Sequence, residues 1–193
     1  MALQTTEIDQ AREYLHRSRN HVLAVTEGLS EGQLRFKPAP DRWSIAENLE
    51  HVVIVQERIL GPVREQLHQA APLPPGTNRR QIEAIVLERV PDRSMKAKAP
   101  APIEPTGSWT LAETLERYTR NSSRLVEWLE STPDLREHAL ESAPLKFLTN
   151  GAFTMMDGYQ LLLTAAGHEE RHVRQIEEVK ADPEYPRAHA SVA

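Results

Sequence analysis

Residues 161–179 read Leu161-Leu-Leu-Thr-Ala-Ala-Gly-His168-Glu-Glu-Arg-His172-Val-Arg-Gln-Ile-Glu-Glu-Val179. An α-helix advances by 100° per residue, which brings several of these residues within about 40° of one line along its surface. They are Leu161, Ala165, His168, His172 and Val179. The segment therefore predicts an amphipathic helix, running from about Thr154 to Lys180, whose apolar stripe carries two histidines.

The two histidines on this stripe are four residues apart. Side chains at this spacing stack on one helix face, about 5 to 6 Å apart, and two imidazoles at that distance can share one ion. A lone histidine on an apolar face is more often a satisfied core residue. Burying both His168 and His172 without a shared partner leaves their ring nitrogens needing separate hydrogen bonds, whereas one metal ion satisfies a nitrogen on each ring. The pair therefore favours a metal site.

Three more segments of the chain have apolar residues at mostly helical spacing. They are residues 5–29, residues 45–67 and the stretch from Thr110 up to Pro133. Capping pairs mark the helix starts. In each pair, the side chain of the first residue accepts a hydrogen bond from the backbone N–H three residues on, and the side chain of that later residue accepts one from the backbone N–H of the first. These pairs are Ser44 with Glu47, Thr110 with Glu113 and Thr154 with Asp157.

The segments between these helices are rich in proline and glycine. Residues 36–43 are expected to form a loop, residues 78–90 a short helix, and the proline-rich residues 91–107 an extended surface crossover. Strand signals are nearly absent. We expect an all-α protein: an antiparallel-type four-helix bundle with a long crossover between the second and third helices, formed by residues 1–182 as one domain. Residues 183–193 are expected to be a disordered tail.

Composition excludes several classes of protein. The formal net charge of −5 gives no basic footprint for nucleic acid. No window approaches the roughly 20 apolar residues of a membrane span, and the N-terminal residues lack the pattern of a signal peptide. We therefore expect a soluble cytoplasmic protein with no nucleic-acid or membrane partner. The chain has no cysteine, so histidine and carboxylate must carry its chemistry, and any thiol must come with the substrate.

A third metal ligand must come from another helix. His51 is the best choice, because it lies in the first half of the second helix, about 120° from the centre of that helix's apolar stripe, on the flank that faces a neighbouring helix. His16 and His21 on the first helix stay open as alternatives, although neither has a histidine four residues on. The other histidines are expected to be solvated; they are His68, His138 and His189.

Residues 168–172 also match the H-E-x-x-H pattern of metalloproteases, in which the glutamate is the general base. Five residues are a weak signal, and the chain lacks the downstream ligands of one such class and the sheet along which these enzymes hold substrate. A metallopeptidase is therefore a minor alternative. Glu169 lies about 100° from His168 around the helix, where it can orient a water molecule without being a peptidase base.

Two segments together resemble the DinB-like superfamily, including its bacillithiol-transferase and metal-dependent hydrolase branches. They are Trp43-Ser-Ile-Ala-Glu-Asn-Leu-Glu-His51 and Gly167-His-Glu-Glu-Arg-His-Val-Arg-Gln-Ile176. In that family a W-S-x-x-E-x-x-x-H pattern begins the second helix, and an H-x-x-x-H followed by Q-I lies on the fourth. Carried over by position, the resemblance implies His51, His168 and His172 as the ligands of one metal ion.

The resemblance further implies a four-helix bundle, often dimeric, that binds zinc or nickel. The family often carries His-Pro followed closely by Phe-Gly before its last helix. This chain has instead Ala143-Pro144 and Phe147-Leu148, with its glycine delayed to Gly151. We expect the pocket in front of the metal to differ accordingly.

Three protein ligands leave a coordination position open for water or substrate, as in catalytic metal sites. The first hypothesis is a metal-dependent transferase or hydrolase acting on a small molecule, with transfer of a low-molecular-weight thiol as the version that the resemblance implies. The second is a non-catalytic metal-binding or stress-response module, in which the ion cross-links two helices. The third is a helical scaffold whose histidines are merely packed.

Overall fold

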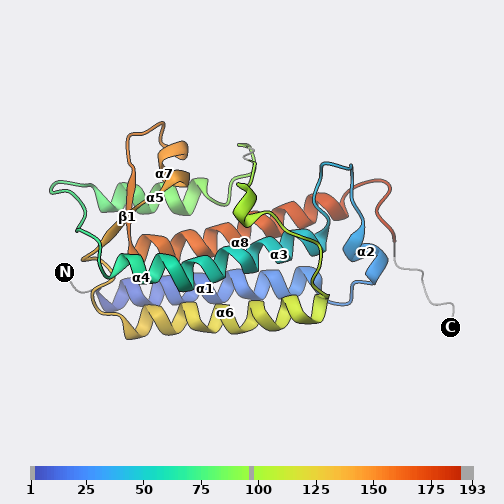
Figure 1. Cartoon of the computed structure of the whole chain (residues 1–193), viewed down its shortest axis with the longest axis horizontal. Helices are drawn as coiled ribbons and strands as arrows, with labels where there is room; N and C mark the ends of the chain where they lie inside the picture. The colour runs from blue at the N-terminus through green and yellow to red at the C-terminus, as the bar shows by residue number, and fades with distance from the viewer. Residues whose placement is uncertain (1–2, 96–97, 188–193) are drawn as a thin grey trace.

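The long helices of the chain lie side by side in the computed structural model, which describes residues 3–95 and 98–187 (Figure 1). Within those residues the four longest helices are α1 Thr5–Thr26, α3 Ile45–Arg58, α6 Leu111–Ser131 and α8 Gly158–Lys180. Helix α1 packs against α6 and α8, and α3 packs against the same two helices. The predicted all-α class is confirmed, and these helices form a bundle.

The bundle is only partly antiparallel. In Figure 1, α1 and α8 run in one direction, whereas α3 and α6 run in the other. Neighbours α1 and α8 are therefore parallel, as are α3 and α6, which corrects the expected antiparallel arrangement. The reason lies in the connection: α5 (Arg79–Arg89) and the crossover after it return the chain to the end of the bundle where α3 began.

The second long helix has an altered middle turn. Helix α3 passes into a π-helical turn, η1 Ile59–Val63, and then into α4 Arg64–Leu67, so the helix predicted for residues 45–67 is present. Pro62 lies inside the π-helical turn. A proline removes one backbone donor and crowds the preceding turn, and a widened turn accommodates it without ending the helix.

Two of the three predicted capping pairs are present, at Ser44 and at Thr110. The third prediction, Thr154 with Asp157, is wrong. Residues Met155–Asp157 form a strand, β2, which pairs antiparallel with β1 Ala139–Glu141, so the backbone there is extended. Helix α8 starts three residues later, and Asp157 itself is the N-cap, accepting a hydrogen bond from the backbone N–H of Gln160 at 2.9 Å.

The connections hold further short elements. Helix α5 matches the predicted short helix, whereas α2 Glu31–Arg35 and α7 Ala143–Leu148 were not predicted. In the described part of the crossover, residues 91–95 and 98–107, the one regular element is the 3₁₀ turn η2 Ala101–Ile103. No helix among the described residues is both long and apolar enough to cross a membrane.

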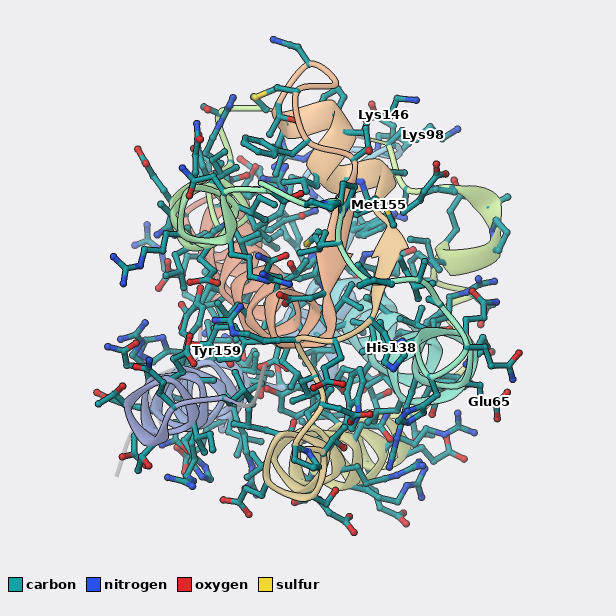
Figure 2. All side chains as sticks on the ribbon, turned by 90° about the vertical axis from the view of Figure 1, so that its left-hand side faces the viewer. Glu65, Lys98, His138, Lys146, Met155 and Tyr159 are labelled. Atoms are coloured by element: carbon teal, nitrogen blue, oxygen red, sulfur yellow. The ribbon has the colours of Figure 1, made fainter. Side chains whose placement is uncertain are left out.

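Helix α8 packs against several other elements of the bundle. Seen along the helices in Figure 2, it lies between α1, α3 and α5, and it contacts all three. Buried apolar residues form one cluster around its first half, with Trp128 and Leu162, and a second around its last turns, with Tyr118 and Ile176. Glu169 and His172 on α8 are therefore buried, whereas Arg174, Glu177 and Glu178 lie on its exposed side.

The end of the chain packs partly onto the bundle. Residues 183–187 were expected in a disordered tail. Tyr185 meets Phe36 edge to face with ring centroids 5.6 Å apart, and the side-chain amide of Gln33 donates to the Pro186 carbonyl at 3.0 Å. Residues 188–193, the rest of the predicted tail, lie outside the described residues.

Gly158 at the start of α8 provides a test of this packing. A Cβ there would lie 2.7 Å from a methyl of Leu135 and 2.9 Å from the Leu135 backbone oxygen. We expect Gly158→Ala to lower the free energy of unfolding by about 1–3 kcal/mol, because the site is already filled. Gly32→Ala is the control, since no atom lies within 4 Å of its added Cβ. Urea unfolding that finds both variants equally stable would contradict this packing.

Candidate metal centre

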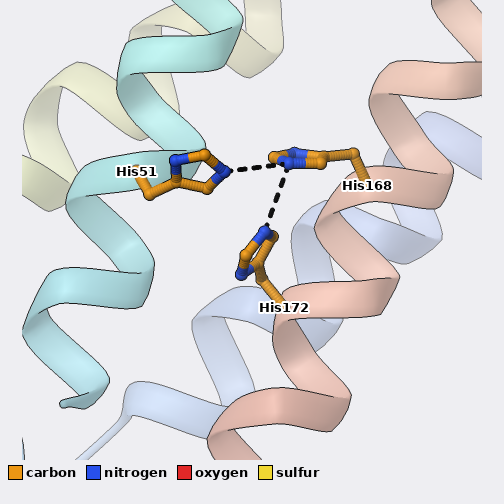
Figure 3. A group of neighbouring side chains, drawn as sticks. All are labelled: His51, His168 and His172. Carbon is orange, nitrogen blue, oxygen red and sulfur yellow. Dashed lines mark hydrogen bonds between the residues drawn. The ribbon is translucent and has the colours of Figure 1, made fainter. Parts of the chain in front are cut away.

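Three histidines from two helices meet in the interior of the bundle (Figure 3). His51 comes from the second turn of α3, and His168 and His172 come from α8. The Nε2 atom of His168 lies 3.2 Å from Nε2 of His51 and 3.2 Å from Nε2 of His172. The three residues form a group whose ligand atoms all lie within 4.8 Å of one another. The structure thus brings together all three predicted ligands.

These distances fit one metal ion. Tetrahedral Zn²⁺ binds histidine nitrogen at about 2.0–2.1 Å, which places two ligand nitrogens about 3.3 Å from each other. The two observed separations of 3.2 Å are close to this value. The group can hold a metal ion without a large rearrangement of the helices.

The hydrogen bond of His51 determines which of its nitrogens carries the proton. Its Nδ1 lies 2.6 Å from the backbone oxygen of Ile103, in the crossover. A carbonyl oxygen only accepts, so Nδ1 must donate, and Nε2 of the neutral ring carries a lone pair. His51 therefore presents a bare Nε2 to the other two histidines.

His172 is oriented in the same way by Asn48. The side-chain N–H of Asn48 donates to the Ser44 carbonyl at 2.8 Å, which turns its Oδ1 toward Nδ1 of His172 at 2.9 Å. Because an amide oxygen only accepts, Nδ1 of His172 must also donate. Its Nε2 is bare as well.

Two bare nitrogens therefore face Nε2 of His168, which carries at most one proton and can donate to only one of them. The other bare nitrogen then has no proton to accept, and if Nε2 of His168 carries no proton, both contacts bring lone pairs together, unless a cation lies between the rings. Burial lowers the pKa of His51 and His172 and, together with the neighbouring His51 and Arg171, lowers the pKa of His168 to about 3. Neutral imidazole is the form that binds metal.

Trp43 lies against the ligand rings. Its ring centroid is 4.8 Å from that of His51 and 6.1 Å from that of His172, against which it stacks. In the sequence, Trp43 begins the W-S-x-x-E-x-x-x-H segment, from which we predicted no contact with the ligands, and we did not predict Asn48 or the Ile103 carbonyl as their partners. The spacing of Asn48 and His51, three residues apart on one helix face, was a usable signal for Asn48.

The other histidines that the structure describes lie outside this group. His16, His21 and His68 are exposed, and His21 lies 2.9 Å from a carboxylate oxygen of Glu170. His138, labelled in Figure 2, donates from Nδ1 to the Ala70 carbonyl at 2.6 Å. His189 lies outside the described residues. His16 and His21 are thereby set aside as alternative ligands.

Glu169, between the two α8 ligands, points into a separate buried network. Its carboxylate accepts hydrogen bonds from Ser18 Oγ at 2.7 Å, the Gln56 amide at 2.8 Å and the Tyr118 hydroxyl at 2.9 Å, each from a different helix. Burial raises its pKa to about 7, although these three donors act in the opposite direction. A carboxylate engaged in this way is not placed to serve as a peptidase base.

The fold and the site together define a helical bundle with an interior three-histidine group. The DinB superfamily model matches residues 14–176, and the chain belongs to the DinB superfamily. A relative from Bacillus subtilis (strain 168), described as uncharacterized protein YuaE, is 28% identical over 154 residues, which make up 79% of this chain and 86% of the relative. No solved structure is significantly similar to the chain.

The separate role of Glu169 gives a prediction. Glu169→Ala leaves three buried donors without their acceptor and should lower the free energy of unfolding of the metal-free protein by about 2–4 kcal/mol. Glu169→Gln should cost less, because the amide oxygen still accepts and the two hydroxyls can reorient. Folded Glu169→Gln protein should keep its metal. If it instead loses metal as completely as His168→Ala does, the carboxylate acts on the ion.

Proposed function

We propose that this DinB superfamily chain binds one divalent metal ion, zinc or nickel, through Nε2 of His51, His168 and His172. The observation that carries the proposal is the fixed protonation of two rings. Asn48 and the Ile103 carbonyl each take the Nδ1 proton of a ligand, so two lone pairs converge on the third imidazole. A cation is the partner that satisfies them together.

We further propose that the ion serves a transferase or hydrolase reaction on a small molecule. Three protein ligands leave a coordination position open, and a bound divalent ion lowers the pKa of a thiol or water placed there toward neutrality. The chain has no cysteine, so in a thiol transfer the sulfur nucleophile belongs to the substrate. The protein's own contribution is to hold three neutral imidazoles in place and to cover them with Trp43 and the crossover.

A non-catalytic metal-binding module is the second candidate, and the burial of two of the three ligands favours it. His51 and His172 are only 4% and 5% exposed. An ion held by α3 and α8 cross-links two helices, and binding that occurs only in the folded state stabilises it.

Metal content tests the ligand set. Purified protein should hold about one zinc or nickel per chain, and His51→Ala, His168→Ala and His172→Ala should each lose most of it. His21→Ala is the matched control, because His21 is an exposed histidine outside the group. Elemental analysis of folded protein, checked by circular dichroism, measures this. Full metal occupancy in His168→Ala would overturn the assignment.

Turnover separates the two candidates. We expect the metal-loaded protein to conjugate a low-molecular-weight thiol to an electrophile or to hydrolyse a small ester, to lose the activity with chelator and to regain it with zinc or nickel. The same samples give thermal melts. A large fall in melting temperature on chelation, with no turnover on any thiol or ester, would contradict the enzyme and support the non-catalytic module.

A further inference from the structure

Glu50, the residue before His51, is buried in contact with the crossover. It is 3% exposed, and its carboxylate accepts three hydrogen bonds from the end of that segment. Oε1 accepts from the backbone N–H of Thr106 at 2.9 Å and from its hydroxyl at 2.6 Å, and Oε2 accepts from the backbone N–H of Gly107 at 2.8 Å. Glu50 thus binds two successive amides of the crossover.

No countercharge pairs with this carboxylate in the part of the chain that the structure describes. Among the residues that the structure describes, no lysine or arginine pairs with Glu50, so the donors of Thr106 and Gly107 alone compensate its burial. Gly107 has φ +70°, a conformation that residues with a side chain rarely adopt. The crossover is therefore shaped at this point to present its amides to the carboxylate.

The same short segment also holds His51. We call residues 101–107 the strap: it begins with the 3₁₀ turn Ala101–Ile103 and ends at Gly107. Near its start, the Ile103 carbonyl takes the Nδ1 proton of His51, and at its end Glu50 holds the backbone. Two adjacent residues of α3 thus fix the two ends of one strap.

We propose that Glu50 is a positioning residue for the metal centre. By fixing Thr106 and Gly107, it holds the Ile103 carbonyl against His51, which keeps the proton on Nδ1 and turns Nε2 toward the metal. This role rests on the proposed function, because the strap orients His51 as a ligand of the proposed metal ion. Glu50 acts through the strap and does not touch the ion.

The charge of Glu50 is what this role requires. A carboxylate accepts at both oxygens, and hydrogen bonds to an ionised acceptor are shorter and stronger than neutral ones. In Glu50→Gln one oxygen becomes an NH₂ group, which faces a backbone N–H of the strap and cannot accept from it. The strap loses one attachment while the volume of the side chain stays the same.

The first measurement is zinc affinity, determined by competition with a chelator. Partners that orient metal ligands typically change affinity 10–100-fold when removed, and we expect a loss in this range for Glu50→Gln. Glu57→Gln is the matched control: it is the same substitution on the same helix, at a residue paired on the surface with Arg117. Equal affinities for the two variants would overturn the proposal.

A second measurement separates positioning from a general loss of stability. In the metal-free protein, ¹⁵N shifts of the His51 ring should report Nδ1–H alone, and Glu50→Gln should shift the ring toward a mixture of both tautomers. A fully Nδ1-protonated His51 in folded Glu50→Gln would contradict the proposal. The ¹⁵N shifts are measured without metal. If the protein binds no metal ion, the proposed function is refuted, and the ¹⁵N shifts still decide whether Glu50 orients His51.

A double variant completes the test. If Glu50 acts through His51, then in the His51→Ala background Glu50→Gln should change the remaining zinc affinity less than twofold. If the double variant instead loses affinity by the product of the two single fold-changes, Glu50 acts independently of His51, because effects at independent sites add in free energy. Thermal melts of each metal-free variant identify any that fail to fold.

Discussion

The three-histidine group depends on which ring nitrogens of His51 and His172 carry a proton. Nδ1 of His51 must donate to a backbone carbonyl, and Nδ1 of His172 must donate to Asn48, so their Nε2 atoms are left as lone pairs facing His168. Imidazoles buried in this way are stable only if something positive or protic satisfies them. A metal ion at their common point meets that need for all three rings, and the surrounding fold prepares the rings for it.

Burial of α8 is what allows this arrangement. Because α1, α3 and α5 pack against it, polar side chains at its buried positions find partners inside the bundle, and those of the H-E-x-x-H sequence do so in two separate groups. His168 and His172 face α3, while Glu169 faces Ser18 and Tyr118 on α1 and α6. One H-E-x-x-H sequence therefore divides between a metal group and a structural network, and its resemblance to a peptidase motif is one of spacing alone.

The sequence predicted the long helices, and the position of His168 and His172 on an apolar stripe followed from helical periodicity alone. His51 depended on the family resemblance, because periodicity placed it only on a flank; it is buried because the crossover lies over it. Contacts across 52 residues, such as His51 with Ile103, leave no periodic signal. The cap of α8 was misplaced for a similar reason: the pairing of β2 with β1, earlier in the chain, makes Met155–Asp157 extended, so no helix begins at Thr154.

The central claim, a metal ion held by three Nε2 atoms, is tested most directly by anomalous X-ray scattering at the zinc or nickel edge from crystals of the metal-loaded protein. We expect one strong peak about 2.0–2.1 Å from Nε2 of His51, His168 and His172. A loaded crystal with no peak between these rings, or a peak bound through Nδ1 of His51 with the Ile103 contact broken, would contradict it.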